Sequence, residues 1–505
     1  MTRREGTALE TVDMNLGTLS DPLFEHALSR PDVPALVQRE TRLTYSGLAG
    51  LVGRSSVHLH ALGVRPGEVV AVGLGFGIDA VVLTLALLRL GAIPVDVAGI
   101  RPAGLALPIA RFQVRRVLAP AVIEVPEGVV CHAVDAPFHT LIAGLGGDRR
   151  NARDPAAVHL LHLAPDRRGG PKAITVTQHQ MQARMRTARL LFPAVFAPGP
   201  SPMMLLSGGM GFAVMTLMAV QFALGGPVGL LPPDPDAGRT ARLIAGAGDA
   251  VALVPEAVCR KFLEIAPAEG LLFPKLRGLI RATSLLSPAE GEALARRVAA
   301  KVWPMHGSAA TGLVAGSLPG PCGAGVWAEA ADGAGQVVPP GTVGHLRYRG
   351  PGVSFGLYRA PAEEQGAEGF RGGWYVGGEV GMVAIDGTIT VTGQAGDLLR
   401  RRGLDMFLPQ IEDAIREYSG TEDAAVVAII PPGEKEPLLI GIVVPKGAPD
   451  LAGLARHCAA ALPVERRPDR LAFVKELPRL ADGKIDRRKL AGMAVRGEAA
   501  KQGHA

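Results

Sequence analysis

Residues 162–175, HLAPDRRGGPKAIT, end like a loop that binds phosphate, but Pro165-Asp166-Arg167-Arg168 stand where small hydroxylated residues would be expected. The run Gly169-Gly170-Pro171-Lys172 contains two glycines, whose backbone N–H groups can surround an anion. It ends in a lysine, which supplies a positive charge. Just before it stand Arg167 and Arg168, and guanidinium groups bind phosphate through charge-assisted hydrogen bonds. Two adjacent arginines are also typical of a solvated basic loop. Two hypotheses therefore stay open for Arg167 and Arg168: a solvated surface loop, which their adjacency favours, and phosphate contacts.

A second pattern has the form of a dinucleotide site. The run Gly75-Phe76-Gly77-Ile78-Asp79-Ala80 fits G-x-G-x-x-A after an apolar strand, and Asp96 ends the next strand, where a carboxylate could bind ribose. Short matches of this kind are frequent in a chain with 65 glycines, because glycine also serves only to turn a strand into a helix. A dinucleotide-dependent enzyme is therefore one hypothesis to test.

The elements around these residues alternate between helix and strand. Ser46 is a candidate N-cap for an apolar-striped helix that ends at Gly63. A strand at 69–74, a helix at 78–90 and a strand at 92–97 follow it. Strands that alternate with helices predict an α/β fold with a mostly parallel sheet.

One uncharged apolar stretch, residues 203–231, is long enough to cross a bilayer. Two glycine pairs, Gly208-Gly209 and Gly225-Gly226, divide it, so we predict a buried strand, loop, helix and strand and no membrane span. The N-terminal residues lack the apolar core of a secretory signal. We expect a cytoplasmic protein.

Composition narrows the class of protein further. A chain of 505 residues with 48% hydrophobic and 20% charged residues is globular and long enough for at least two domains. The net charge is +6, but the basic residues are scattered and only 4% of residues are aromatic, which argues against nucleic-acid binding. Four cysteines without CxxC spacing indicate ordinary thiols in a reducing compartment, with neither a zinc site nor a disulfide framework.

Nearly the whole chain resembles the adenylate-forming superfamily, which includes acyl-CoA synthetases, aryl-CoA ligases, luciferase and the adenylation domains of peptide synthetases. The resemblance implies a large multi-sheet N-terminal domain, residues 1–396, and a small mobile α+β C-terminal domain, residues 397–505, with the hinge at Asp397. It rests on motifs that occur in the family's order, of which the last is the most specific: TYSGLAGLVGRSSVHLHALGVRPGEVVAV, LLRLGAIPVDV, GGPKAITVTQHQ, GHLRYRGPGVSFGLYR, GGWYVGGEVGMVAIDGTITVTGQAGDLLRRRG and LPRLADGKIDRRKL.

The resemblance also implies a reaction. Enzymes of this kind join a carboxylic acid, here fatty or aromatic, to AMP from ATP and then pass the acyl group to a thiol of coenzyme A or a carrier protein. Two anions meet in the first step, so cations, Mg²⁺ and N–H donors are required. Lys484 matches the catalytic lysine. The positions that match nucleotide-binding residues are Gly169, Lys172, His306, Gly307, Glu379 and Gln394.

Several of these positions depart from the family pattern. The phosphate loop lacks its usual serines and threonines, and Ala310 stands where a glutamate would hold Mg²⁺, so no metal ligand is expected there. Glu379 replaces an aspartate and Gln394 an arginine. Two hypotheses follow: a divergent AMP-forming ligase, and a superfamily member that no longer adenylates and binds an acyl group, an acyl-thioester or a protein partner. Restoring glutamate at position 310 should raise Mg²⁺-dependent turnover if the rest of the metal site is intact.

An apolar wall for the acyl group is expected in the region of residues 205–212. Methionine is unbranched and adapts its shape to a ligand, but it fills ordinary cores equally well. The methionines of this region are therefore candidates for either role: Met203, Met204, Met210, Met215 and Met218.

Overall fold

The computed structural model describes residues 18–151, 153–164, 172–196, 201–282, 288–359, 369–395, 398–401, 404–431, 436–478 and 485–495. The chain forms two compact units. Unit 1 comprises Met1–Glu329, Arg347–Gly377 and Ile385–Ile389, and unit 2 comprises Ala330–Leu346, Gly378–Ala384 and Thr390–Ala505. The α/β fold with a large N-terminal and a smaller C-terminal domain is confirmed, while the boundary at 396/397 stays a prediction.

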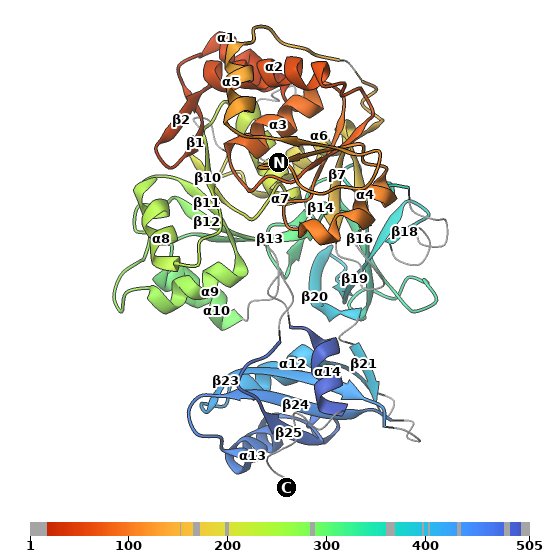
Figure 1. Cartoon of the computed structure of the whole chain (residues 1–505). Helices are drawn as coiled ribbons and strands as arrows, with labels where there is room; N and C mark the ends of the chain where they lie inside the picture. The colour runs from red at the N-terminus through yellow and green to blue at the C-terminus, as the bar shows by residue number, and fades with distance from the viewer. Residues whose placement is uncertain are drawn as a thin grey trace, which may run out of the picture. The chain divides into compact units, whose positions relative to one another are not determined.

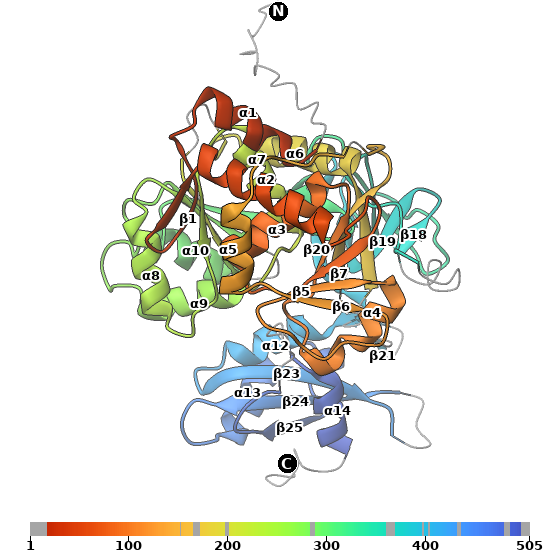
Figure 2. The same ribbon diagram turned by 45° about the horizontal axis from the view of Figure 1, so that its top comes forward.

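The first sheet of unit 1 contains the predicted βαβ segment. Its strand order is β6-β5-β3-β4-β7-β8, parallel except for the antiparallel pair β7 and β8. Figure 2 shows β5, β6 and β7 of this sheet with α4 beside them. The elements of this part are β3 (Val69–Val72), α3 (Ile78–Arg89), β4 (Ile93–Asp96), α4 (Ala106–Phe112), β5 (Arg116–Ala119), β6 (Val130–Ala133), α5 (Ala136–Gly144), β7 (Val158–Ala164), β8 (Lys172–Thr177) and α6 (Gln178–Leu191).

The second sheet of unit 1 has eight strands in the order β14-β13-β12-β11-β9-β10-β1-β2. Helices α8, α9 and α10 lie along β10 to β13 in Figure 1 and cover one face of this sheet. Its elements are α1 (Asp21–Ser29), β1 (Pro34–Gln38), β2 (Thr41–Thr44), α2 (Tyr45–Ala61), β9 (Met203–Leu206), α7 (Phe212–Ala223), β10 (Val228–Leu231), α8 (Ala237–Gly246), β11 (Val251–Pro255), α9 (Glu256–Ile265), β12 (Gly278–Ala282), α10 (Pro288–Arg297), β13 (Val302–Ser308) and β14 (Gly312–Ala315).

A third sheet has the strand order β15-β20-β19-β17-β16, and β18 pairs with β19. The small C-terminal part of the chain has its own sheet, β23-β24-β25, and a hairpin of β21 and β22. The bounds of these elements are β15 (Gly320–Pro321), β16 (Trp327–Ala331), β17 (Gly344–Arg349), β18 (Gly369–Arg371), β19 (Trp374–Val383), β20 (Thr388–Gln394), β21 (Leu398–Arg401), β22 (Leu404–Phe407), α12 (Leu408–Arg416), β23 (Thr421–Ile429), β24 (Leu438–Pro445), α13 (Leu451–Ala461), β25 (Arg470–Phe473) and α14 (Arg487–Val495).

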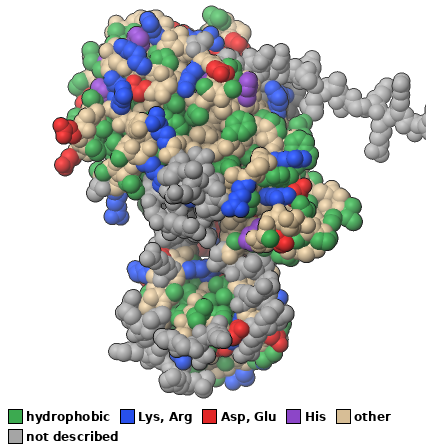
Figure 3. All heavy atoms as spheres, turned by 90° about the vertical axis from the view of Figure 1, so that its right-hand side faces the viewer, with side chains coloured by type: hydrophobic (Ala, Val, Ile, Leu, Met, Phe, Trp, Pro, Cys, Tyr) green, Lys and Arg blue, Asp and Glu red, His purple; other side chains and the backbone are tan. Residues whose placement is uncertain are grey.

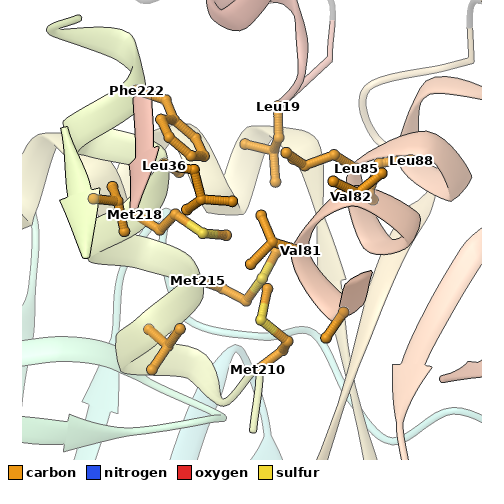
Figure 4. Close-up of a cluster of buried hydrophobic side chains, with 14 of the residues drawn as sticks. Leu19, Leu36, Val81, Val82, Leu85, Leu88, Met210, Met215, Met218 and Phe222 are labelled. Carbon is orange, nitrogen blue, oxygen red and sulfur yellow. The ribbon is translucent and has the colours of Figure 1, made fainter. Parts of the chain in front are cut away.

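The largest apolar core of unit 1 lies between the first two sheets and is filled by α2, α3 and α7. Figure 4 shows Met210, Met215 and Met218 packed against Val81 of α3 and Leu36 of β1. Met203 belongs to the same buried cluster, while Met204 is half-buried at the neighbouring one. Four of the five candidate methionines are therefore core residues in this structure.

The predicted local elements agree with the structure apart from one cap. The strands, the helix and their parallel pairing around residues 69–97 are confirmed, and Gly63 has the left-handed φ of +91° that a helix C-terminus favours. Ser46 was wrong as the N-cap. The hydroxyl of Thr44 accepts from Gly47 N at 3.1 Å, so α2 begins one residue before Ser46.

The uncharged stretch 203–231 forms β9, α7 and β10, as predicted. No helix in the described part of the chain is long and apolar enough to cross a membrane.

Candidate active site

The centre of the candidate site is a tight turn that joins β13 to β14. Ser308 N donates to Thr311 Oγ1 at 2.9 Å, and Thr311 N donates to Ser308 Oγ at 3.1 Å. The two hydroxyls are 3.0 Å apart and close the turn. Short hydroxyl side chains that bond to nearby backbone N–H groups favour such turns, so residues 308–311 fix their own conformation.

His306 and Gly307 precede this turn at an irregularity in the pairing of β13 with β14. A Cβ on Gly307 would lie 2.1 Å from Gly312 O, so only glycine fits at this crossing. His306 is 8% exposed, and its ring lies 6.4 Å from the ring of Tyr348. The imidazole therefore belongs to the protein interior here, and stacking on adenine is not shown.

The side chain of Arg184 on α6 hydrogen-bonds to the backbone of the turn and of a neighbouring segment. Its Nε donates to Gly352 O at 2.8 Å, and its Nη2 donates to Ala309 O at 2.9 Å and to Ala310 O at 3.3 Å. A Cβ on Gly312 would approach Arg184 Cγ to 2.7 Å, so the arginine packs directly over the turn. Burial lowers the pKa of Arg184 to about 9. In the described part of the chain, the guanidinium of Arg184 thus donates hydrogen bonds to three backbone carbonyls.

His162 of β7 lies close enough to Arg184 to be influenced by its charge. Burial, together with that charge, lowers the pKa of His162 to about 3, so the ring is neutral at pH 7. Its Nε2 and Nη1 of Arg184 are both buried without a hydrogen-bond partner in the described part of the chain. A neutral imidazole and an arginine held by carbonyls therefore form a buried polar layer under the turn.

Strand β8 connects the predicted phosphate loop to the same turn. Lys172 is its first residue and pairs with Ala164. Thr175 Oγ1 donates to Gly356 O at 2.9 Å, and Ser354 Oγ donates to Thr175 O at 2.7 Å. Ser354 N in turn donates to Ala310 O at 2.7 Å. Three motifs that are far apart in the sequence are thus joined by hydrogen bonds.

Position 310 does not fit a metal ligand. Ala310 is 2% exposed and packs with Ile174 and Leu357 in an apolar cluster. No group of three His, Cys, Asp or Glu side chains that could hold a metal occurs in the ranges that the structure describes. The methyl group of Ala310 and its apolar neighbours offer no oxygen ligand, so they do not fit Mg²⁺.

The two predicted ribose residues are in unit 2 and lie on neighbouring strands. Glu379 is on β19 and Gln394 ends β20, and both are half-buried. A Cβ on Gly378 would lie 3.3 Å from Gln394 Oε1, so the glutamine side chain extends across to β19. The Gln394 side chain therefore lies beside Gly378. Because successive side chains of a strand point to opposite faces, this contact does not bring the Gln394 amide to the Glu379 carboxylate.

The remaining predicted residues lie outside the described ranges: Gly169, Arg167, Arg168, Asp397 and Lys484. The described segments on either side of residue 484 are well anchored. Asp486 N donates to Pro478 O at 2.8 Å, and Arg487 binds the carboxylate of Glu412 with both of its terminal nitrogens. Glu412 is 2% exposed and also accepts from Val426 N at 2.7 Å.

The residues of the dinucleotide pattern have structural partners instead. Gln38 Oε1 accepts from Ile78 N at 3.0 Å, so a side chain of β1 caps the N-terminus of α3. Asp96 accepts from Ala98 N at 2.9 Å and from Met210 N at 2.6 Å, and burial raises its pKa. The positions that would receive pyrophosphate and ribose are therefore occupied by the protein itself.

The sequence did not indicate Arg184, His162 or Ser354 as site residues. Arg184 lies 168 residues from Gly352 in the chain, and only the tertiary fold brings them together. One feature of the sequence could have drawn attention to Arg184. It belongs to a helix with several other polar residues, and the structure shows Gln178, Gln180 and Thr187 of this helix buried as well. A polar buried face on a helix implies partners elsewhere, but it does not say which ones.

Comparison with known proteins gives a consistent picture. The protein-family profile for AMP-binding enzymes matches residues 23–145. A salicylyl-CoA synthase / salicylate adenylyltransferase from Streptomyces sp. is 29% identical over 95% of this chain and 94% of its own length. A 2-hydroxy-7-methoxy-5-methyl-1-naphthoate–CoA ligase from Streptomyces carzinostaticus is 25% identical over 95% and 93%. ATP-bound MatB from Rhodopseudomonas palustris superposes with a TM-score of 0.82 at 20% identity, covering 94% of this chain and 99% of that chain.

Proposed function

Because the chain has the AMP-binding domain and the fold of the adenylate-forming superfamily, we propose that it is an AMP-forming ligase for an aromatic acid that bears a hydroxyl group beside its carboxylate. The acceptor is a thiol, either of coenzyme A or of a carrier protein.

One observation carries the proposal. The two relatives described above align with almost the whole chain, and both are named for aromatic acids with a hydroxyl at the position next to the carboxylate. Most apolar side chains of residues 203–218 are buried in the core, and apolar surroundings of this kind suit an uncharged ring better than a charged side chain. Fatty acids, the other class expected from the sequence, are less well supported.

The reaction has two steps. A carboxylate oxygen attacks the α-phosphorus of ATP and pyrophosphate leaves; the thiolate sulfur then attacks the acyl carbon and AMP leaves. Lys484 would neutralise the anionic groups of the first step, and Lys172 would contribute a second cation near the phosphates. The carboxylate of Glu379 would accept hydrogen bonds from the ribose hydroxyls, and the amide of Gln394 would hydrogen-bond to the nucleotide.

The test is release of AMP by the purified protein with ATP, coenzyme A and a panel of 2-hydroxyaryl acids, unsubstituted aryl acids and fatty acids. We expect 2-hydroxyaryl acids to give the highest kcat/KM. Lys484→Ala should lower adenylation by about 10²-fold or more, since one preorganised charge contributes that much. Lys489→Ala is the matched control, because Lys489 is exposed on α14.

Equal rates for Lys484→Ala and Lys489→Ala would refute the role of Lys484. The absence of AMP release with every acid, from a protein that is shown to be folded, would refute the ligase. The non-adenylating alternative would then be the one to pursue, although the relatives that span this chain are named as ligases.

A further inference from the structure

The charge of the surface does not by itself locate a site for the acid. Basic and acidic side chains are interspersed with hydrophobic ones over the face of the molecule in Figure 3. The order of the strands is a better guide. Ligands of open α/β sheets bind outside the carboxyl ends of the strands, at a point where the helices that follow two neighbouring strands lie on opposite faces of the sheet. The first two sheets of unit 1 each have such a point.

In the first sheet, this point lies at the neighbouring parallel strands β3 and β4. Helix α3 follows β3 and packs on the face that carries Val70 and Val72. Helix α4 follows β4 and packs on the opposite face, with Val69 and Ala71. The last residue of β4 is Asp96, so a carboxyl group stands at this carboxyl end.

In the second sheet, the corresponding strand is β9. Helix α7 follows β9 and packs in the core between the first two sheets, whereas α8, which follows the neighbouring strand β10, packs on the other face. Residues 207–211 connect β9 to α7. Within this loop Gly208 is exposed, and a Cβ on Gly211 would meet nothing within 4 Å in the described chain. Open glycine backbone lets a ligand approach the main chain closely.

Asp96 joins these two carboxyl ends. Its Oδ2 accepts from Met210 N at 2.6 Å, and its Oδ1 accepts from Ala98 N at 2.9 Å. A Cβ on Gly209 would collide with Asp96 Oδ2, so the close approach of the loop requires glycine there. The side chain of Met210 packs in the core beside Val81 (Figure 4). One carboxylate therefore sets the position of the loop after β9 relative to the end of β4.

The chemistry of this loop suits the acid better than ATP. Residues 203–231 contain no charged side chain, so a triphosphate would find no cation in this segment. The carboxylate of Asp96 adds a negative charge, which disfavours phosphate groups further. Apolar residues beside a few accessible polar groups suit an aromatic ring.

We propose that Asp96 is a positioning residue for the acid substrate: it holds the loop 207–211, which contacts the acid where the carboxyl ends of β4 and β9 meet. This inference rests on the proposed ligase function and assigns part of its acid site. Ser207 supports the same loop, because its Oγ donates to Gly209 O at 2.7 Å and accepts from Gly209 N at 3.2 Å.

The experiment measures the Kd of 2-hydroxybenzoate for the full-length protein by calorimetry, and the KM values for ATP and for the acid from AMP release. Asp96→Asn has one acceptor oxygen in place of two, so an amide NH2 faces one of the two backbone N–H groups. We expect the Kd and KM for the acid to rise by about 10-fold or more and the KM for ATP to change by less than about 2-fold. Ser207→Ala should change the acid Kd in the same direction, and it decides the question if Asp96→Asn does not fold.

Asp135→Asn is the matched control. Asp135 also follows a strand of the first sheet, and its Oδ1 accepts from a backbone N–H, that of Phe138, at 3.1 Å. Far-UV circular dichroism of each variant reports whether it is folded.

The outcomes separate the role of Asp96 from the ligase activity. Equal rises in the KM for ATP and for the acid would overturn the positioning role and leave the ligase intact. The same holds for an acid Kd that changes no more in Asp96→Asn than in Asp135→Asn, and absence of acid binding to the folded wild type would also overturn the role. Acid binding that Asp96→Asn weakens, in a protein that releases no AMP, would instead refute the ligase and support the role of Asp96.

Discussion

The substitution Ala310→Glu tests whether position 310 can again serve a metal. Ala310 is 2% exposed and packs with Ile174 and Leu357, so a longer side chain would enter an apolar cluster. A carboxyl in such surroundings has its pKa raised by about 3 units, to about 7.3, which costs about 3.4 kcal/mol at pH 7. Arg184 lies near the Ala310 carbonyl and would offset part of this through its charge. We therefore expect a net loss of about 2–4 kcal/mol in the free energy of unfolding and no gain in turnover with Mg²⁺.

The assay compares chemical denaturation of Ala310→Glu and Ala310→Gln across pH. Glutamine has nearly the same size, so the difference between the two variants reports the charge. The introduced carboxyl has a folded pKa above its unfolded value of about 4.3, so its penalty is absent below pH 4.3 and grows as pH rises towards the folded pKa. A constant difference across pH, or turnover that rises with Mg²⁺ in Ala310→Glu alone, would refute this reasoning and would show that the side chain reaches the nucleotide.

Two further predictions concern buried groups. His162→Gln should remove a loss of stability in acid: the folded pKa of about 3 lies below the unfolded value of about 6.5, so the unfolded state binds the proton first and stability falls by up to about 1.4 kcal/mol for each pH unit below 6.5. Denaturation at pH 7.5 and pH 5.5 measures this, and an unchanged pH slope in the variant would contradict it. Glu412→Gln should destabilise the anchoring of α14 by about 3 kcal/mol, because Arg487 loses the charge that it binds. Hydrogen exchange of residues 487–495 checks this prediction, and protection equal to that of the wild type would contradict it.

The sequence predicted most of the fold because its signals were local. The strands and the helix of residues 69–97 follow from apolar periodicity, and Gly63 follows from its position after a helix. The missed cap has a simple cause. Thr44 and Ser46 are both good cap residues, and the choice between them depends on where the preceding strand β2 ends. That end is set by pairing with β1, which a local pattern does not contain.

The candidate site was harder to predict because its contacts are long-range. Motif matches located His306, Gly307 and Lys172, and the structure brings their strands to the turn 308–311. Nothing near Arg184 in the sequence indicates that its guanidinium binds Ala309 O, 125 residues away. The dinucleotide pattern was misleading because its local sequence does not show long-range contacts either. Residues from distant segments use the groups that would bind the dinucleotide: Gln38 accepts from Ile78 N at the start of α3, and Met210 N donates to Asp96.

The conformation of the turn at residues 308–311 does not depend on the side chain at position 310. Its shape depends on the Ser308 and Thr311 hydroxyls, on the guanidinium of Arg184 and on Ser354 N, and all of these contact backbone atoms or one another. The side chain at position 310 takes no part in these bonds, so the backbone of the turn does not require glutamate there. The presence of alanine at position 310 therefore leaves the framework of the turn intact, and its side chain packs in the apolar cluster with Ile174 and Leu357. A ligase built this way needs its neutralising charge from cationic side chains, and Lys172, Arg167, Arg168 and Lys484 are the cations whose sequence positions suit that role.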